Sequence, residues 1–288
     1  AMSAVLAGES GDVDKVGLMI NECKRMKIEV LPPSVNESFS QFTVVNERPY
    51  KIRFGLTTIK NFGAGISGAI TAERKRGGKF NSLADFLDRI KDKNLNKKSL
   101  ESLIKCGAMD EFGERGKLLG NLENLLEYHR ERINEPENQG SLFGLMPEGA
   151  VLPALRLESS PEASQKDRLF WEKELLGLYI SGHPLEGHKD KLSSVKTNLS
   201  KLEELREGSE AVIAGIVESA RDVLTKRNER MVFMKLSDLS GSTEVAIFPK
   251  VLSDYREFVQ QDACIAIKGR VSKRKGETSF IAEKIKAL

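Results

Sequence analysis

The sequence predicts a multi-domain α+β chain in which a helical region is followed by a small five-stranded β-barrel. Three observations support this fold class. Apolar residues recur at helical spacing from about residue 56 to residue 133, and short alternating apolar runs fill residues 211–288. Between them lies a polar stretch rich in Pro, Gly, Glu and Ser. Because 288 residues are also long for a single core, we expect several domains.

The composition is that of a soluble globular protein, with 40% hydrophobic and 30% charged residues. No apolar run approaches the ~20 residues that span a bilayer, and the first residues do not resemble a signal peptide. The three cysteines, Cys23, Cys106 and Cys264, are odd in number and far apart, which favours reduced thiols over disulfides. We therefore expect a cytoplasmic protein without membrane contact.

The net charge of +3 conceals an uneven distribution along the chain. Residues 51–110 hold 13 Lys and Arg against 6 Asp and Glu, a net charge of +7. Residues 111–170 have a net charge of −4, and residues 211–288 a net charge of +4. Two basic modules separated by acidic connections favour a polyanionic partner over a membrane surface, because no long basic amphipathic helix accompanies them.

Residues 1–50 predict a helix followed by an extended segment. Val13, Val16 and Ile20 share one face of a helix within residues 1–30, and two prolines and a turn-rich run end it. The alternation of apolar residues over 42–54 is typical of strands.

Residues 51–133 predict a helical domain. Ser82 and Asn96 are residue types that cap helix N-termini, and Gly107 is the type that ends a helix. Leucines at helical spacing then predict one longer helix up to Ile133.

Residues 134–165 are interpreted as an inter-domain linker that is too polar to pack well, and residues 166–210 as a helical connector. From 211 the predicted strands are 211–219, 231–237, 243–248, 263–271 and 277–285, with a helix near 249–258. Three strands, a helix and two further strands is the element order of the OB-fold, a Greek-key barrel.

A tight hairpin at residues 59–66 is the first candidate binding element. Asn61 and Gly63 are residue types that accept a positive φ, and Phe62 between them can enter the core. Ala64 and Gly65 are small, so the free N–H groups of the following helix can approach a phosphate closely. This is the physics of a helix-hairpin-helix motif, which holds DNA by its backbone. An ordinary helical corner with a glycine cap is the alternative.

Residues 97–110 are a weaker echo of the hairpin, for which we favour packing, with its lysines as possible phosphate contacts. The predicted DNA-binding residues of the helical domain are Lys60, Asn61, Gly63, Ala64, Gly65, Arg74, Lys97 and Lys98.

The barrel offers a second candidate surface, because OB-folds bind ligands on the face of strands 2 and 3 and in the adjoining loops. We expect the basic loops after the first and fourth strands to converge on one groove. Phe233 could offer a stacking ring, although a core position is the alternative. The predicted nucleic-acid contacts are Lys226, Arg227, Arg230, Phe233, Lys273, Arg274 and Lys275.

The polar linker contains an apolar pair that has no core to enter. Leu142 and Phe143 follow Gln139, and a hydrophobic pocket of a partner protein is a natural destination for them. Catalytic and metal-binding patterns are missing: the three histidines are not at metal-ligand spacing with any cysteine, and no P-loop or Asp-x-Asp pair is present. We therefore predict no catalytic residue, metal site or cofactor in this chain.

Several stretches, in order, resemble the C-terminal part of the bacterial DNA polymerase III alpha subunits, which are replicative C-family polymerases. NECKRMKIEVLPPSVNES resembles the end of their fingers domain, and FGLTTIKNFGAGISGAI, GKFNSLADFLDRI and LNKKSLESLIKCGAMDEFG resemble their helix-hairpin-helix region. QGSLFG is similar to their sliding-clamp-binding motif, WEKELLGLYISGHPL to the segment before the OB domain, and MVFMKLSDLSGSTEVAIFP to two strands of that domain. Asn61 stands where the family hairpin usually has glycine.

The resemblance implies that residues 51–133 hold product duplex, that the OB-fold lies near single-stranded template, and that Gln139, Leu142 and Phe143 bind a sliding clamp. It implies other replicase subunits as partners, and it places the Mg²⁺-binding palm carboxylates outside this chain. Two alternatives stay open: a stand-alone OB-fold protein that binds single-stranded DNA or tRNA, and a structural adaptor whose basic loops are simply solvated.

Overall fold

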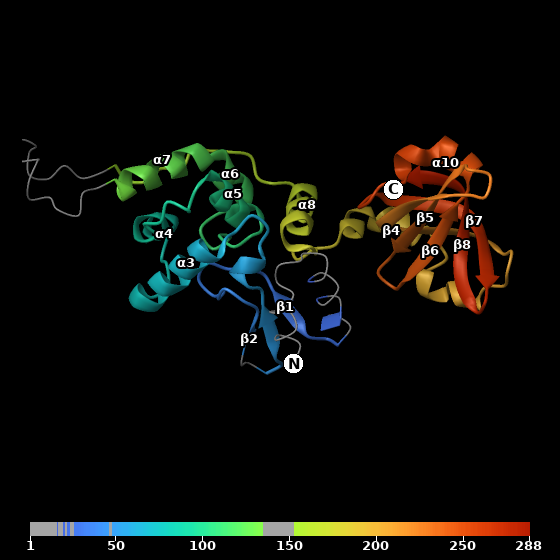
Figure 1. Ribbon diagram of the computed structural model, residues 1–288, viewed down its shortest axis with the longest axis horizontal. Coiled ribbons are helices and arrows are strands. Elements are labelled where there is room, and N and C mark those ends of the chain that lie inside the picture. Colours follow the sequence, from blue (N-terminus) through green and yellow to red (C-terminus); the bar gives the residue numbers. More distant parts are fainter. Residues whose placement is uncertain (1–15, 17–19, 21, 24–25, 46–47, 135–152) are drawn as a thin grey trace, which may run out of the picture. The chain divides into compact units, whose positions relative to one another are not determined.

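The computed structural model describes residues 16, 20, 22–23, 26–45, 48–134 and 153–288, which form two compact units, residues 1–181 and 182–288 (Figure 1). The first is mainly helical and the second is a closed barrel, as the predicted fold class requires. Within the described part of the chain, no helix is long and apolar enough to cross a membrane.

A small sheet lies at the start of the helical unit. It consists of β1 (Glu29–Leu31), β2 (Thr43–Val45) and β3 (Lys51–Arg53), with β3 in the centre, parallel to β1 and antiparallel to β2. The predicted extended segment is therefore confirmed over β2 and β3. The predicted helix does not reach residue 30, because the chain turns at residues 26–27 and then enters β1. Ile52 in β3 points into the core.

One 3₁₀ turn and six helices follow the sheet in the described part of the helical unit. They are η1 (Leu56–Thr58), α3 (Ala64–Gly77), α4 (Leu83–Arg89), α5 (Lys97–Lys105), α6 (Arg115–Gly120), α7 (Leu122–Ile133) and α8 (Gln165–Leu176). The predicted caps are confirmed: Ser82 Oγ accepts from the Asp85 N–H, and Asn96 and Ser99 form a reciprocal capping box. Gly107 ends α5 with a φ of +88°.

The single long helix predicted for residues 118–133 is broken at Asn121. This residue has a φ of −106° and a ψ of 11°, so it ends α6 and begins α7. Its amide accepts from the N–H of Glu158 at 2.8 Å and donates to the carbonyl of Glu158 at 3.0 Å. The Asn121 side chain, at the break between the two helices, therefore pairs with the backbone of a segment that is distant in sequence.

Residues 153–164, which we call the strap, lie on α6 and α7. Leu155 and Leu157 pack against the helical core. Gly116 and Gly120 of α6 leave room for the strap, since a Cβ on Gly116 would lie 2.3 Å from the Pro161 carbonyl oxygen and one on Gly120 1.9 Å from Ser160 Oγ. The interpretation of residues 134–165 as a non-packing linker is therefore wrong for 153–164. The leucines of the strap pack against the helical core, and its backbone forms hydrogen bonds with side chains of the helices.

The base of the strap lies beside the end of α7. Arg132 Nη2 donates to the Pro153 carbonyl at 3.2 Å. Asn134 and Pro153, the described residues on either side of this stretch, both lie in the helical unit, so the stretch between them does not connect the two units. The connection comes later, after Ser181.

A buried ionic cluster joins the turn after α5 to α6 and α8. Arg115 makes two hydrogen bonds to the Asp110 carboxylate, both at 3.0 Å, and lies 3.5 Å from Glu172. Glu172 is 0% exposed and also accepts from the N–H and hydroxyl of Ser181. Burial alone would lower the pKa of Arg115, but Asp110 and Glu172 hold that pKa above its usual value.

The barrel unit begins with η2 (Pro184–His188), α9 (Lys189–Ser193) and η3 (Leu199–Glu204). The barrel consists of β4 (Glu210–Leu224), β5 (Arg230–Ser237), β6 (Ser242–Ile247), α10 (Pro249–Tyr255), η4 (Arg256–Phe258), β7 (Cys264–Arg274) and β8 (Glu277–Ala287). The strands close in the order β4-β5-β6-β8-β7, which confirms the predicted OB-fold order. The predicted connector 166–210 is divided, with α8 in the helical unit and η2, α9 and η3 in this one.

The register of the barrel is staggered. Starting at Arg221, the paired residues lead through Phe233, Ala246, Ile281 and Arg270 and return to β4 at Glu210. One circuit therefore shifts by eleven residues along β4, the kind of stagger that closes a small barrel of tilted strands. Even-numbered positions of β5 (Val232, Met234, Leu236) fill the interior. Odd-numbered positions such as Phe233 consequently face outward.

Candidate nucleic-acid interface

The hairpin before α3 is held in place by the core. Asn61 has a φ of +66°, as predicted, and the Phe62 ring is only 5% exposed. The N–H of Lys60 donates to the Leu175 carbonyl at 2.9 Å, which fixes the hairpin to α8. Gly63 differs from expectation: its φ is −82° and its ψ is 160°, ordinary extended backbone. One left-handed residue, Asn61, makes the turn, so Gly63 is not needed for backbone conformation.

Gly63 instead leaves space at the start of α3. Gly63, Ala64 and Gly65 are exposed, and a Cβ on either glycine would meet nothing within 4 Å. No side chain caps this helix, so among the described residues the N–H groups of its first turn have no side-chain acceptor. Together with the helix dipole, these open donors form a surface that favours an anion.

Arg74 is used by the fold rather than by this surface. Its two terminal nitrogens donate to the carbonyls of Val35 and Ser38, both at 2.7 Å, and the guanidinium stacks on the Phe39 ring at 5.1 Å. Partial burial lowers the pKa of the Arg74 guanidinium. We therefore no longer assign Arg74 a phosphate contact, because its donors already have protein acceptors.

The predicted lysines differ in how far they are neutralised. Lys97 pairs with Glu123 at 2.5 Å, and this hydrogen bond raises the pKa of Lys97. Lys60 and Lys98 are exposed and form no ion pair with any residue that the structure describes. Lys97 and Lys98 lie in the first turn of α5, on a different helix from the hairpin. Lys60 is thus a cation that has no ion pair among the described residues and that closely precedes the open start of α3 in sequence.

The weaker echo of the hairpin, residues 97–110, is followed by α6, and other parts of the protein cover the start of that helix. The Glu114 carboxylate accepts from the N–H of Lys117 at the start of α6 and from the N–H of Ala163 in the strap. Burial alone would raise the pKa of Glu114, but these backbone donors hold that pKa below its usual value. The Glu114 carboxylate and the strap thus cover the start of α6, whereas the N–H donors at the start of α3 are open. This difference is consistent with a packing role for residues 97–110.

The two basic loops of the barrel project from opposite ends of its strands. The β4–β5 loop (225–229) follows the pair Leu224–Arg230, near η4, where Arg256 pairs with Asp222. The β7–β8 loop (275–276) lies at the other end of the barrel, the end that carries the β5–β6 turn, because β8 runs parallel to β6. The predicted convergence of the two loops is therefore not found. The strand register separates them, so that they flank the barrel wall from two sides.

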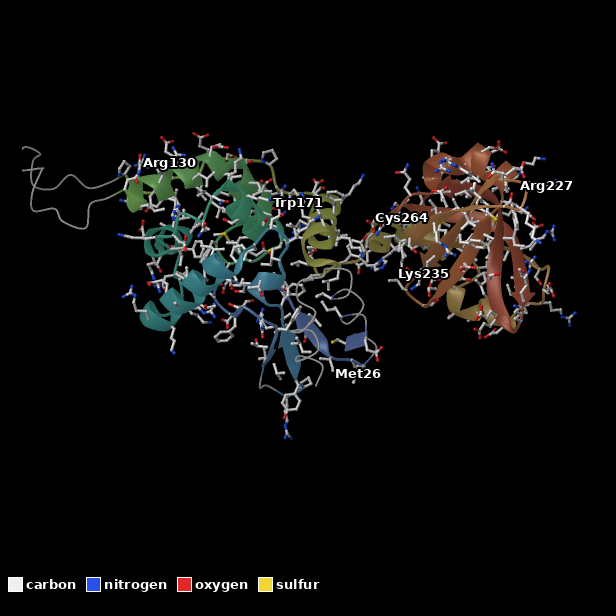
Figure 2. The ribbon with its side chains drawn as sticks, viewed as in Figure 1. Met26, Arg130, Trp171, Arg227, Lys235 and Cys264 are labelled. Atoms are coloured by element: carbon white, nitrogen blue, oxygen red, sulfur yellow. The ribbon has the colours of Figure 1, made fainter. Side chains whose placement is uncertain are left out.

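The loop cations are less neutralised than the wall cations. On the wall, Lys235 pairs with Glu218, Lys268 with Glu210, and Arg270 with Glu283, at 2.7–3.0 Å. By contrast, none of the following has an ion pair among the described residues: Lys226, Arg227, Arg230, Arg274 and Lys275. Figure 2 shows Arg227 and Lys235 well separated on the barrel. Lys273 is partly used, since its Nζ donates to the Glu203 carbonyl at 2.8 Å.

Phe233 is not a core residue, so the alternative that placed it in the core is wrong. It lies outside the interior cluster, is partly exposed and carries the Arg221 guanidinium 5.8 Å from its ring. Sequence reasoning did not single out Phe248, which is 40% exposed directly after β6. Phe248 could have been found from its position two residues after Ala246, the strand partner of Phe233, since residues two apart on a strand face the same side.

Gln139, Leu142 and Phe143 lie outside the described residues. In the described ranges, no group of three or more His, Cys, Asp or Glu residues could hold a metal ion.

Comparison with known proteins follows the two units. A family model described as a helix-hairpin-helix motif matches residues 27–118, and one described as an OB-fold nucleic acid binding domain matches residues 211–288. The chain is 35% identical to DNA polymerase III subunit alpha of Borreliella burgdorferi over 290 residues, which are 99% of this chain and 25% of the relative.

The same subunit of Thermus aquaticus is 37% identical over 276 residues, covering 94% of this chain and 22% of the relative. The same subunit of Deinococcus radiodurans is 36% identical over 299 residues, covering 100% of this chain and 22% of the relative. The chain thus spans 22–25% of the length of these curated relatives. Over 94–100% of its own length the chain is therefore similar to the bacterial DNA polymerase III alpha subunits, through a helix-hairpin-helix module and an OB-fold.

Proposed function

We propose that this chain is the DNA-binding portion of a replicative DNA polymerase, acting in the cytoplasm. The observation that carries the proposal is the open start of α3, where exposed Gly63, Ala64 and Gly65 present uncapped N–H groups beside Lys60. Such a surface binds phosphate without reading bases, as a polymerase needs for product duplex of any sequence. The barrel, with its loop cations and Phe233, binds single-stranded template.

We assign DNA synthesis itself to a longer polypeptide, a proposal supported by the 22–25% share of its relatives' length that this chain covers. We expect its Mg²⁺-binding carboxylates outside these 288 residues, and we assign no catalytic role to any residue here. Other replicase subunits are partners of that longer polypeptide.

A substitution at Gly63 tests the duplex surface. Because the backbone of Gly63 is extended and a Cβ there meets nothing, Gly63→Val should fold normally while its side chain blocks the phosphate. We expect duplex affinity to fall at least about tenfold, the loss of one charge-assisted hydrogen bond, and equally for unrelated sequences. Fluorescence anisotropy measures it. Gly187→Val, also in open space, is the matched control. Unchanged affinity of Gly63→Val would remove the hairpin from the interface.

The unpaired loop cations should set the salt dependence of single-strand binding. Replacing Lys226, Arg227, Arg274 and Lys275 by glutamine should reduce the slope of log affinity against log salt by up to about 0.7 for each phosphate that is no longer neutralised. The control replaces Arg256, Lys268 and Arg270, which are already paired with carboxylates. If both variants change the slope equally per charge, the loops are not the binding site.

We further propose that Gln139, Leu142 and Phe143 dock into a hydrophobic pocket of a ring-shaped sliding clamp. Burial of two large apolar side chains contributes about 1.5–3 kcal/mol each, from which the ordering cost of the chain is subtracted. We therefore expect micromolar affinity, strengthened when DNA holds both partners together. Calorimetry with the purified clamp should show no binding for the Leu142→Ala, Phe143→Ala double variant, whose DNA affinity stays normal. Equal clamp affinity of wild type and variant would contradict the proposal.

A further inference from the structure

We infer that Phe248 is a second base-stacking ring, which together with Phe233 binds two unpaired bases on the outer wall of the barrel. This inference rests on the proposed single-strand binding by the OB-fold and adds to it a specific platform beyond the loops. Phe248 lies between β6 and α10, where its backbone is still extended, with a φ of −73° and a ψ of 161°.

The strand register places the two rings on one face. Phe233 pairs with Ala246, and Phe248 is two residues beyond Ala246 in the same extended direction. Positions two apart on a strand point to the same side, and diagonal neighbours on adjacent strands lie about 7–8 Å apart. That spacing lets two neighbouring bases of an extended strand each meet one ring.

The wall around the rings is apolar and closed. Met231 and Ala246 share the outward parity of Phe233, stand outside the interior cluster, and are nevertheless only 7% and 8% exposed. Phe248, two residues beyond Ala246, remains 40% exposed, and none of the described residues makes a ring or cation contact with it. An exposed ring close in register to covered apolar residues can stack on a base.

The charges nearby indicate a nucleic acid rather than an apolar protein surface. Arg221, which lies over Phe233, and Arg230, at the first position of β5, have no ion pair among the described residues. The cations of the β4–β5 loop follow directly on the same two strands. Apolar rings bordered by unneutralised cations match an occupant with flat apolar faces and a negatively charged backbone.

The experiment compares Phe248→Leu with wild type in binding labelled oligothymidylate. Leucine keeps an apolar side chain at this position but removes the ring. We expect about tenfold weaker binding with an unchanged slope of log affinity against log salt, because stacking releases no counterions. An abasic oligonucleotide should bind both proteins equally, since it has no base to stack. Phe248→Trp should bind oligothymidylate at least as tightly as wild type.

Phe170→Leu, at a 61% exposed phenylalanine of α8, is the matched control and should change nothing. Equal oligothymidylate affinity of wild type, Phe248→Leu and Phe248→Trp would overturn the inference while leaving loop-driven binding intact. An equal loss with the abasic strand would also overturn it, because the defect would then not involve bases. If wild type itself did not bind, the proposed single-strand function would fail together with the inference.

Discussion

Replacing Arg115 by alanine is expected to destabilise the helical unit by about 3–5 kcal/mol, the cost of leaving a buried charge without its partner. Glu172 is fully buried, and Arg115 is its cationic neighbour in the cluster. The loss should appear as a lower urea midpoint of the fluorescence of Trp171, the single tryptophan of the chain, which lies in α8 beside Glu172 (Figure 2).

The control for this prediction is Arg76→Ala. Arg76 also forms a short ion pair, with Glu73 at 2.7 Å, but its side chain is 73% exposed, so the midpoint should hardly move. Similar midpoints for Arg115→Ala and Arg76→Ala would show that the buried cluster contributes no more than a surface pair.

Gly116→Ala should detach the strap from α6. The added Cβ would lie 2.3 Å from the Pro161 carbonyl oxygen and 2.4 Å from the Ala163 nitrogen, and backbone atoms cannot move aside as a flexible side chain can. We expect a cost of about 1–3 kcal/mol, typical of overpacking, with its main effect local to residues 153–164. Limited proteolysis should therefore cut the strap of the variant faster than that of wild type.

Gly68→Ala is the matched substitution, since Gly68 is also helical but a Cβ there meets nothing within 4 Å. It should stabilise α3 by about 0.5–1 kcal/mol, because alanine loses less backbone entropy than glycine in a helix. A strap that resists protease equally in both variants would mean that α6 can shift to admit the methyl group.

Features that depend on neighbours in sequence can be predicted. Ser82 and Asn96 are recognisable as caps because their partners lie three residues away. The barrel strands follow from alternation and turn residues, and the turn at Asn61 from the tolerance of asparagine for positive φ. Each of these is decided within one or two turns of chain, where residue type largely fixes the geometry.

Features that depend on distant segments cannot be predicted in this way. Arg74 is an exposed-looking cation in sequence, yet its acceptors are carbonyls more than thirty residues earlier. The strap is polar in composition, and only the surface of α6 makes it pack. The shared basic character of the two barrel loops suggests that they meet, whereas the strand register separates them. The charge and polarity of a residue limit the contacts that it can make, and its contacts with segments distant in sequence decide which of them form.

The hydrogen bond from Arg132 to the Pro153 carbonyl has a mechanical consequence. Both ends of the stretch that carries the proposed clamp motif are anchored to the helical unit, so a protein holding that motif pulls on this unit from two attachment points. Force from such a partner would reach the hairpin of α3 through a folded body and would bypass the connection after Ser181.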